Sequence, residues 1–185
     1  MKKIILTAAA VFALTFANAQ DKKESSEGFS KGDVFVSGTM SITSVSNGGT
    51  SESTFMPSVG YFMSEKIAIS ATFGVMNGID GVNGQKATAF GVGAAYFFNP
   101  GNQFSTNVNV GLAMANVDNN GAKVTATSLG LGYGMNYFLS SKFALTANLG
   151  VLSYTSGKPD GGDATTITSL DVDFNNVMFG LVYKF

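Results

Sequence analysis

The chain has 185 residues, with eleven basic and twelve acidic side chains, a formal net charge of −1, and no cysteine, histidine or arginine. Without clustered Lys and Arg we expect no nucleic-acid partner, and without cysteine there is no disulfide framework and no thiol chemistry. The missing histidine removes the usual general base and the commonest neutral metal ligand. Charged residues are 12% of the chain, about half the usual share of roughly 25%.

The first 19 residues have the pattern of a secretory signal peptide. Lys2 and Lys3 precede an apolar stretch over residues 4–16, and Ala17-Asn18-Ala19 forms a small-x-small cleavage site before Gln20. The apolar stretch is shorter than the about 20 residues of a membrane-spanning helix, so a retained anchor helix is the weaker alternative. We predict a signal peptide over residues 1–19, a flexible periplasmic leader over 20–32 and one folded domain over 33–185.

Beyond residue 32 the sequence alternates between large apolar and small or polar side chains in eight stretches, as strands with one apolar face do. The turn-rich gaps between them alternate in length: residues 64–66, 99–102 and 140–142 are short, and 46–52, 77–86, 116–123 and 156–166 are longer. Pro57 predicts a bulge in the second stretch, and the alternation reverses near Asn175 and Asn176. The expected strands cover residues 33–44, 53–64, 67–75, 89–98, 104–114, 129–139, 143–151 and 177–185.

The composition of the two faces distinguishes a membrane barrel from a soluble one. A soluble, lipocalin-like barrel would carry charges on its outer face, but residues 34–51, 67–79, 87–117 and 124–141 contain no charged side chain. On a lipid-facing surface this absence is required, because one Lys at the bilayer midplane costs about 2–4 kcal/mol. We therefore predict an all-β, eight-stranded antiparallel up-and-down transmembrane β-barrel, with its large side chains toward lipid and both termini on the periplasmic side.

The last strand and an internal repeat link the sequence to a known group of proteins. Phe179, Leu181, Tyr183 and Phe185 share one face of the terminal strand, and the unit Tyr61-Phe62-Met63-Ser64-Glu65-Lys66 recurs as Tyr137-Phe138-Leu139-Ser140-Ser141-Lys142. With these features the chain resembles the small eight-stranded outer-membrane β-barrels, namely the OmpA-like membrane domain, the OmpX- and OmpW-type proteins and the porin-family barrels. The resemblance implies location in the outer membrane.

The resemblance also implies partners. The terminal strand would be an assembly signal read by the barrel assembly machinery, and the outer face would contact outer-membrane lipid. We expect no peptidoglycan-binding domain beside the predicted barrel, so no cell-wall binding is carried over. We expect a monomer without cofactors.

The repeated units predict two sets of aromatic residues near the short turns. Tyr61, Tyr96 and Tyr137 fall on the lipid face, where they would form an interfacial girdle. Phe62, Phe97 and Phe138 fall on the inner face, whose other members at mid-depth are mostly glycine. We hypothesise that these three rings close a narrow polar cavity at its periplasmic end, and the alternative is that they only fill the core.

Few residues suggest chemistry. Outer-membrane barrel enzymes, by family resemblance, use a His beside Ser, Asp or Asn, so we predict no catalytic site. Asp160, Asp163, Asp171 and Asp173 could gather oxygen ligands for Ca²⁺, but their spacing matches no ligand loop, and an ordinary solvated loop is the preferred interpretation. The leading function is a structural or surface-interaction role through external loops. The alternatives are a narrow pore or a conduit for small or apolar solutes, and then an outer-membrane enzyme.

Overall fold

The computed structural model describes residues 27–43, 52–78, 85–119, 121–170 and 177–185. No helix in these segments is both long enough and apolar enough to cross a membrane. The strands are β1 (Val34–Thr43), β2 (Glu52–Phe62), β3 (Ile67–Asn77), β4 (Gln85–Phe97), β5 (Phe104–Asn119), β6 (Ala122–Phe138), β7 (Phe143–Pro159), β8 (Thr165–Leu170) and β9 (Met178–Lys184).

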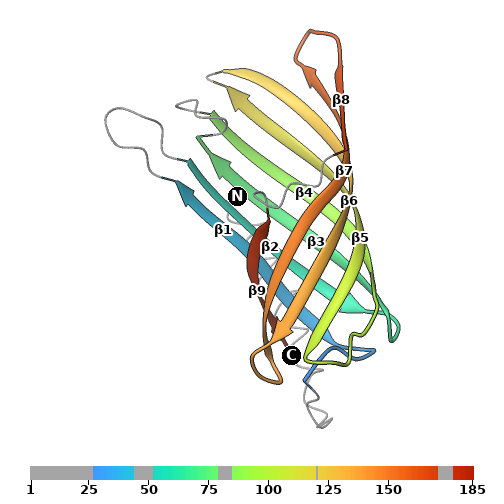
Figure 1. Cartoon of the computed structure of the whole chain (residues 1–185). Helices are drawn as coiled ribbons and strands as arrows, with labels where there is room; N and C mark the ends of the chain where they lie inside the picture. The colour runs from blue at the N-terminus through green and yellow to red at the C-terminus, as the bar shows by residue number, and fades with distance from the viewer. Residues whose placement is uncertain (1–26, 44–51, 79–84, 120, 171–176) are drawn as a thin grey trace.

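The strands form one closed antiparallel barrel with eight strand positions (Figure 1). Each strand from β1 to β7 pairs with the next along the chain. β8 and β9 occupy the eighth position in succession: β8 pairs with the upper part of β7, and β9 pairs with its lower part. β9 also pairs with β1 from Phe35 to Gly38, which closes the barrel. The predicted eight-stranded up-and-down barrel is therefore confirmed.

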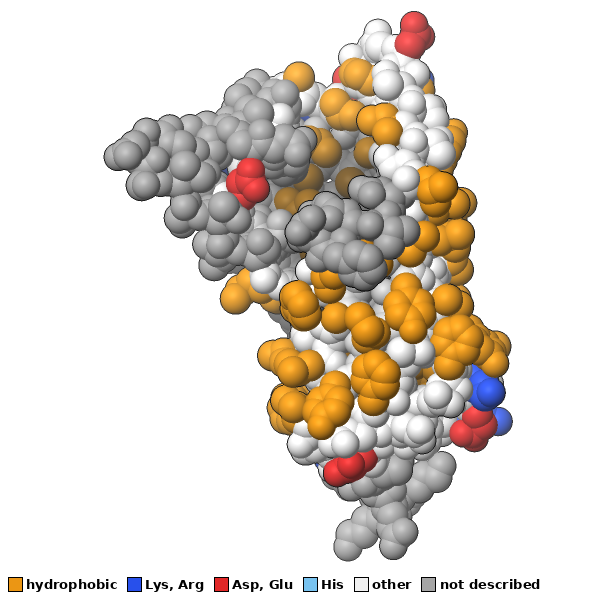
Figure 2. Space-filling model, in the orientation of Figure 1, with side chains coloured by type: hydrophobic (Ala, Val, Ile, Leu, Met, Phe, Trp, Pro, Cys, Tyr) orange, Lys and Arg blue, Asp and Glu red, His pale blue; other side chains and the backbone are white. Residues whose placement is uncertain are grey.

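The large apolar side chains lie on the outside. On β5, Val108, Val110 and Leu112 are all about half exposed, whereas Asn107, just before them, is buried and the intervening Asn109 and Gly111 are less exposed. Figure 2 shows hydrophobic side chains over the barrel wall, with the coloured charged side chains near its two ends. Because successive residues of a strand point to opposite faces, the small and polar residues line the interior. The predicted assignment of the two faces is confirmed.

The irregularities in the sheet are not where the sequence predicted them. Pro57 pairs with Gly38 of β1, and the β2–β3 ladder resumes beyond it in the same register, so the bulge expected there is absent. Pro57 lacks an N–H group, and the β2–β3 pairing is interrupted at this point, between Phe55 and Ser58. A register shift occurs instead on β7, where Leu131 faces Leu152 but Gly132 faces Gly150. The predicted reversal near Asn175 and Asn176 lies outside the described residues.

Two of the expected long loops are largely strand. β5 continues to Asn119 and β6 begins at Ala122, so most of residues 116–123 form paired β-structure. β7 continues to Pro159 and β8 begins at Thr165, which shortens the loop expected over residues 156–166. The polar side chains that indicated loops, such as Asn116 and Thr125, instead pair across a hairpin that extends the barrel wall. In Figure 1 these hairpins form the upper end, and the short turns form the lower end.

The repeated units fold into matching turns at the lower end. The Ser64 hydroxyl accepts hydrogen bonds from the backbone N–H groups of Lys66 and Ile67, at 3.3 and 3.0 Å. Ser140 accepts the equivalent bonds from Lys142 and Phe143, at 3.4 and 3.2 Å. Such side-chain-to-backbone bonds favour tight reversals. The repeat in the sequence therefore corresponds to a repeated hairpin, which positions the aromatic residues before each turn.

Candidate functional site: the barrel interior

The three phenylalanines predicted to point inward come together at the lower end of the interior. Phe62 and Phe138 are completely buried, and Phe97 is nearly so. The rings of Phe62 and Phe97 lie 4.9 Å apart between centroids. The backbone N–H of each of these residues donates a hydrogen bond to a backbone carbonyl just beyond the paired strands. The acceptor is Asp33 for Phe62, Lys66 for Phe97 and Gln103 for Phe138. The lower ends of three strands thus hold the rings in one layer.

Two further phenylalanines complete this layer, and the sequence analysis missed both. Phe29 is 2% exposed, and its ring lies 4.7 Å from Phe62, 4.8 Å from Phe138 and 5.4 Å from Phe97 between centroids. Phe35, on β1, lies 5.5 Å from Phe29. We call the five residues Phe29, Phe35, Phe62, Phe97 and Phe138 the aromatic cluster. Offset and edge-to-face ring pairs of this kind add about 0.5–1.5 kcal/mol beyond burial.

Phe29 lies in the segment over residues 20–32 that was predicted to be a flexible leader, and backbone contacts hold it in place. The backbone N–H of Phe29 donates a hydrogen bond to the Pro100 carbonyl at 2.6 Å. Gly28 has φ of +145°, and a Cβ built on it would lie 2.3 Å from the Gly101 backbone. Only glycine permits this approach. The end of the leader therefore packs against the turn at Pro100 and Gly101, with the Phe29 ring buried.

Lys184 connects the last strand to the leader and to the residue before β1. The Lys184 ammonium is 3.6 Å from the Asp33 carboxylate, and it also donates a hydrogen bond to the Gly28 carbonyl. It lies over the Phe138 ring, 5.4 Å from the centroid. Lys184 is buried, and a buried ammonium needs such partners to offset the loss of water. Its contacts thus join the leader, the start of β1 and the end of β9.

A cavity of about 490 Å³ lies above the aromatic cluster, with Phe29, Phe35 and Phe97 among its lining residues. Four asparagines line its wall, and we call them the amide band: Asn107, Asn109, Asn136 and Asn148. No charged side chain lines this cavity within the described segments. The cavity is roomy because its wall is rich in glycine and alanine, which leave space inside an eight-stranded barrel that larger side chains would fill.

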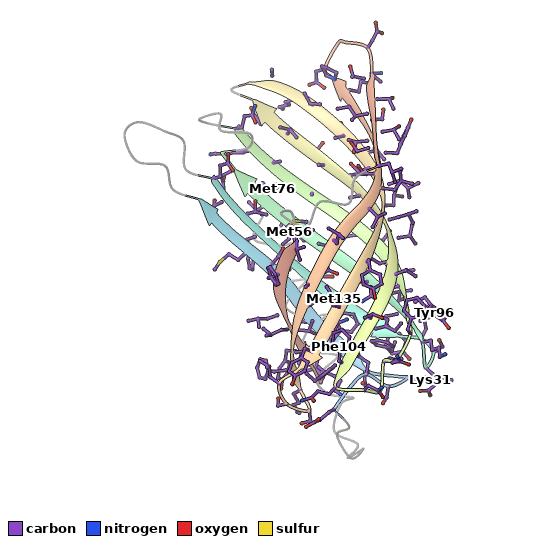
Figure 3. All side chains as sticks on the ribbon, in the orientation of Figure 1. Lys31, Met56, Met76, Tyr96, Phe104 and Met135 are labelled. Carbon is purple, nitrogen blue, oxygen red and sulfur yellow. The ribbon has the colours of Figure 1, made fainter. Side chains whose placement is uncertain are left out.

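The residues predicted for the lipid face lie where the alternation placed them. Tyr61, Tyr96 and Tyr137 are each a little under half exposed on the outside of the lower end, and Tyr96 projects outward in Figure 3. The Lys66 ammonium lies over the Tyr96 ring at 5.9 Å from its centroid. This arrangement is typical of a membrane interface, where an aromatic ring meets lipid and a lysine reaches water. The girdle itself stays a prediction.

The terminal strand presents its large side chains outward. Phe179 and Leu181 are exposed, and the Tyr183 ring contacts Phe185 and Phe143 at 5.0 and 4.9 Å between centroids. Recognition of this strand by an assembly machinery stays a prediction.

The acidic residues considered for Ca²⁺ fall partly outside the described residues. Asp171 and Asp173 lie in a segment that is not described, and Asp160 and Asp163 are exposed around the β7–β8 turn. Within the described segments no group of three or more His, Cys, Asp or Glu side chains is placed to hold a metal ion.

The interior and its lipid-facing wall can be compared with known proteins. Residues 6–185 match the family described as outer membrane protein beta-barrel domain. The chain belongs to this family. Its membership places the barrel in the outer membrane of the cell and confirms the resemblance drawn from the repeat and the terminal strand. In a sequence comparison, no curated protein matches the chain.

Solved structures share the fold of this barrel at low sequence identity. The N-terminal β-barrel domain of Pseudomonas aeruginosa OprF is 16% identical, with a TM-score of 0.57, and the match covers 85% of this chain and 100% of that domain. Neisserial surface protein A is 18% identical, with a TM-score of 0.51, over 83% of this chain and 96% of that protein. At these identities the likeness concerns the fold alone.

Proposed function

We propose that this barrel is a non-enzymatic outer-membrane protein that contacts partners at the cell surface through the hairpins of its upper end. The main support is β8, which extends beyond the barrel wall with β7 (Figure 1). β8 pairs with β7 through Thr165–Leu170, and no second partner strand for it occurs among the described residues. All six of its residues are exposed.

The edge of β8 that has no partner among the described residues has the chemistry of a contact surface. An edge strand offers unpaired backbone N–H and C=O groups, to which an extended segment of another protein can add. The sequence of β8 has no charge and no proline, the features that commonly protect such edges. Ile167 and Leu170 are 61% and 77% exposed, so they add apolar contacts on the two sides of this strand.

Shortening the β7–β8 hairpin tests this proposal. Cells that display the parent protein should be retained on some members of a panel of immobilised soluble proteins, and a variant lacking residues 156–168 should lose this retention. The matched control shortens the β5–β6 hairpin around Asn119 and Ala122 and should keep it. Equal retention of the parent and the β7–β8 variant would refute a contact role for β8.

A transport role is the second candidate, and the cavity above the aromatic cluster supports it. In planar bilayers we expect the combined Phe62→Ala, Phe97→Ala and Phe138→Ala variant to conduct better than the parent, and equal conductance would refute a stopper made of these rings. Liposome swelling with the parent itself would favour the transport role over the surface role.

An enzymatic role would require product from lipid substrates above a heat-killed control.

A further inference from the structure

Among the residues that the structure describes, the walls of the cavity above the aromatic cluster carry no charged side chain. The nearby ionic pair, Lys184 and Asp33, does not line it. A charged ligand entering the cavity would lose water without gaining an opposite charge, which is costly. The lining therefore selects for a neutral occupant.

The amide band supplies both hydrogen-bond donors and acceptors. The Asn109 side-chain amide donates to the Asn107 side-chain carbonyl at 3.2 Å, and Asn148 donates to the Thr146 hydroxyl at the same distance. An asparagine side chain has two donor hydrogens and one carbonyl acceptor, so each of these bonds leaves further capacity. Hydroxyl groups, which both donate and accept, are the natural partners of such a surface.

At the lower border of the band, one polar atom on each of two side chains has no hydrogen-bond partner within the described segments. Ser105 and Asn136 face each other across β5 and β6. The Ser105 hydroxyl and the Asn136 amide nitrogen are buried and unpaired, and the two residues are 1% and 5% exposed. Unpaired buried polar groups cost about 1–3 kcal/mol. Asn136 also lines the cavity, so a small turn of its amide would present this donor to an occupant.

Aromatic and amide groups are neighbours on this wall. Phe97 faces Asn107 across β4 and β5, and both line the cavity. Directly opposite residues of an antiparallel pair have Cβ atoms about 4.5–5.5 Å apart. One molecule can therefore contact the ring with an apolar face and the amide with a polar edge.

Two glycines on β6 leave the space that the side chains of Asn107 and Asn109 occupy. A Cβ added to Gly134 would lie 2.5 Å from the Asn107 side-chain nitrogen, and one added to Gly132 would lie 2.7 Å from the Asn109 side-chain oxygen. Each asparagine thus lies across a glycine of the neighbouring strand. The side chains are seated in fixed positions, as a binding wall requires.

We propose that this cavity binds a neutral, hydroxyl-rich small molecule of the carbohydrate class, about one or two sugar rings in size. A pyranose has an apolar face of C–H groups for the phenylalanines and a rim of hydroxyls for the asparagines. The volume of about 490 Å³ is within the range of roughly 300–1,000 Å³ for small-molecule sites. In Figure 2 the upper end of the molecule is hollowed beside the coloured hydrophobic side chains. This binding does not depend on conduction or on the β8 edge.

The test is a titration of the purified full-length protein in lipid nanodiscs, with asparagine side-chain amide NMR signals as the readout. Glucose should saturate the signals with a dissociation constant on the order of 1 mM. Glucosamine and glucuronate carry a charge on a ring of the same size, and they should bind at least about tenfold more weakly. This comparison needs no variant, so it does not depend on the folding of a mutant.

Variants then locate the site. Asn107→Ala and Asn136→Ala should each weaken glucose binding about tenfold. The matched control is Asn116→Ala, because Asn116 is an exposed residue of the same strand at the upper end and does not line the cavity. It should leave binding unchanged. Absence of saturable binding, equal affinity for the charged sugars, or an equal effect of Asn116→Ala would each overturn the proposal.

Discussion

The lower and upper parts of the interior are both lined by inward-pointing side chains, yet they differ in packing and in polarity. The lower part is filled by the aromatic cluster and fastened by one ion pair. The upper part is lined by amides, hydroxyls, glycines, alanines and some larger apolar side chains around a cavity. An eight-stranded barrel is just wide enough for side chains to fill. The size of the inward side chain therefore decides whether a given depth is sealed or hollow.

The largest effect in this comparison is expected from removing a ring in the lower part. Phe62→Ala should lower the free energy of unfolding by about 3–5 kcal/mol, since it leaves a cavity among packed rings. Denaturant unfolding in lipid vesicles measures this change. The matched control is Phe98→Ala, whose ring is 44% exposed beside the same lower end and should cost clearly less. Equal losses would show that the cluster is not a packed core.

The next effect concerns the ion pair beneath the rings. Lys184→Met should lower the free energy of unfolding by about 1.5–3 kcal/mol, because hydrogen bonds to a charged group are lost. It should also raise the amide exchange rate of residues 28–32. The combined Lys184→Met and Asp33→Asn variant should recover part of the loss, since no uncompensated carboxylate remains. If the loss in the combined variant equals the sum of the losses of Lys184→Met and Asp33→Asn measured singly, the ion pair does not couple these residues.

A smaller effect should follow from adding one carbon to the inner wall of the lower part. A Cβ on Gly60 would lie 2.1 Å from the Phe35 ring, so Gly60→Ala should cost about 1–3 kcal/mol by overpacking. Gly150 is the matched control, because a Cβ there meets nothing within 4 Å. Gly150→Ala should change the free energy of unfolding by less than about 0.5 kcal/mol. A comparable loss in both variants would mean that crowding does not distinguish the two sites.

The smallest effect is expected in the upper part. Asn107→Ala removes one hydrogen bond at the border of a cavity, so it should cost about 0.5–1.5 kcal/mol in the same unfolding measurement. A loss as large as that of Phe62→Ala would indicate that the amide band, and not the aromatic cluster, holds the barrel together.

The sequence was sufficient to predict the barrel, its two faces and three of the five clustered rings. Alternation identifies a face because the side-chain period of a strand is two residues. The repeat then places Phe62 and Phe138 at equivalent depths. Phe29 was missed because it lies in a polar segment without alternation. Phe35 was missed because the first strand has no copy of the repeat.

Register was less predictable than strand position. Pro57 changes local hydrogen bonding without a register shift, and the shift on β7 between Gly150 and Leu152 has no local sequence signal. Register depends on the neighbouring strands on both sides. The polar hairpins of β5 to β8 were assigned to loops because exposed strand extensions have the same polar composition as loops. Their pairing, like the edge of β8, is visible only in three dimensions.

The central claim is that the large side chains of this barrel face lipid and the small ones enclose the interior. Because the chain has no cysteine, single-cysteine variants along β5 can each carry one fluorescent label in vesicles that contain a quenching brominated lipid. Labels at Val110→Cys and Leu112→Cys should be strongly quenched, and labels at Asn109→Cys and Gly111→Cys should not. Equal quenching at all four positions, or the reverse order, would contradict the account.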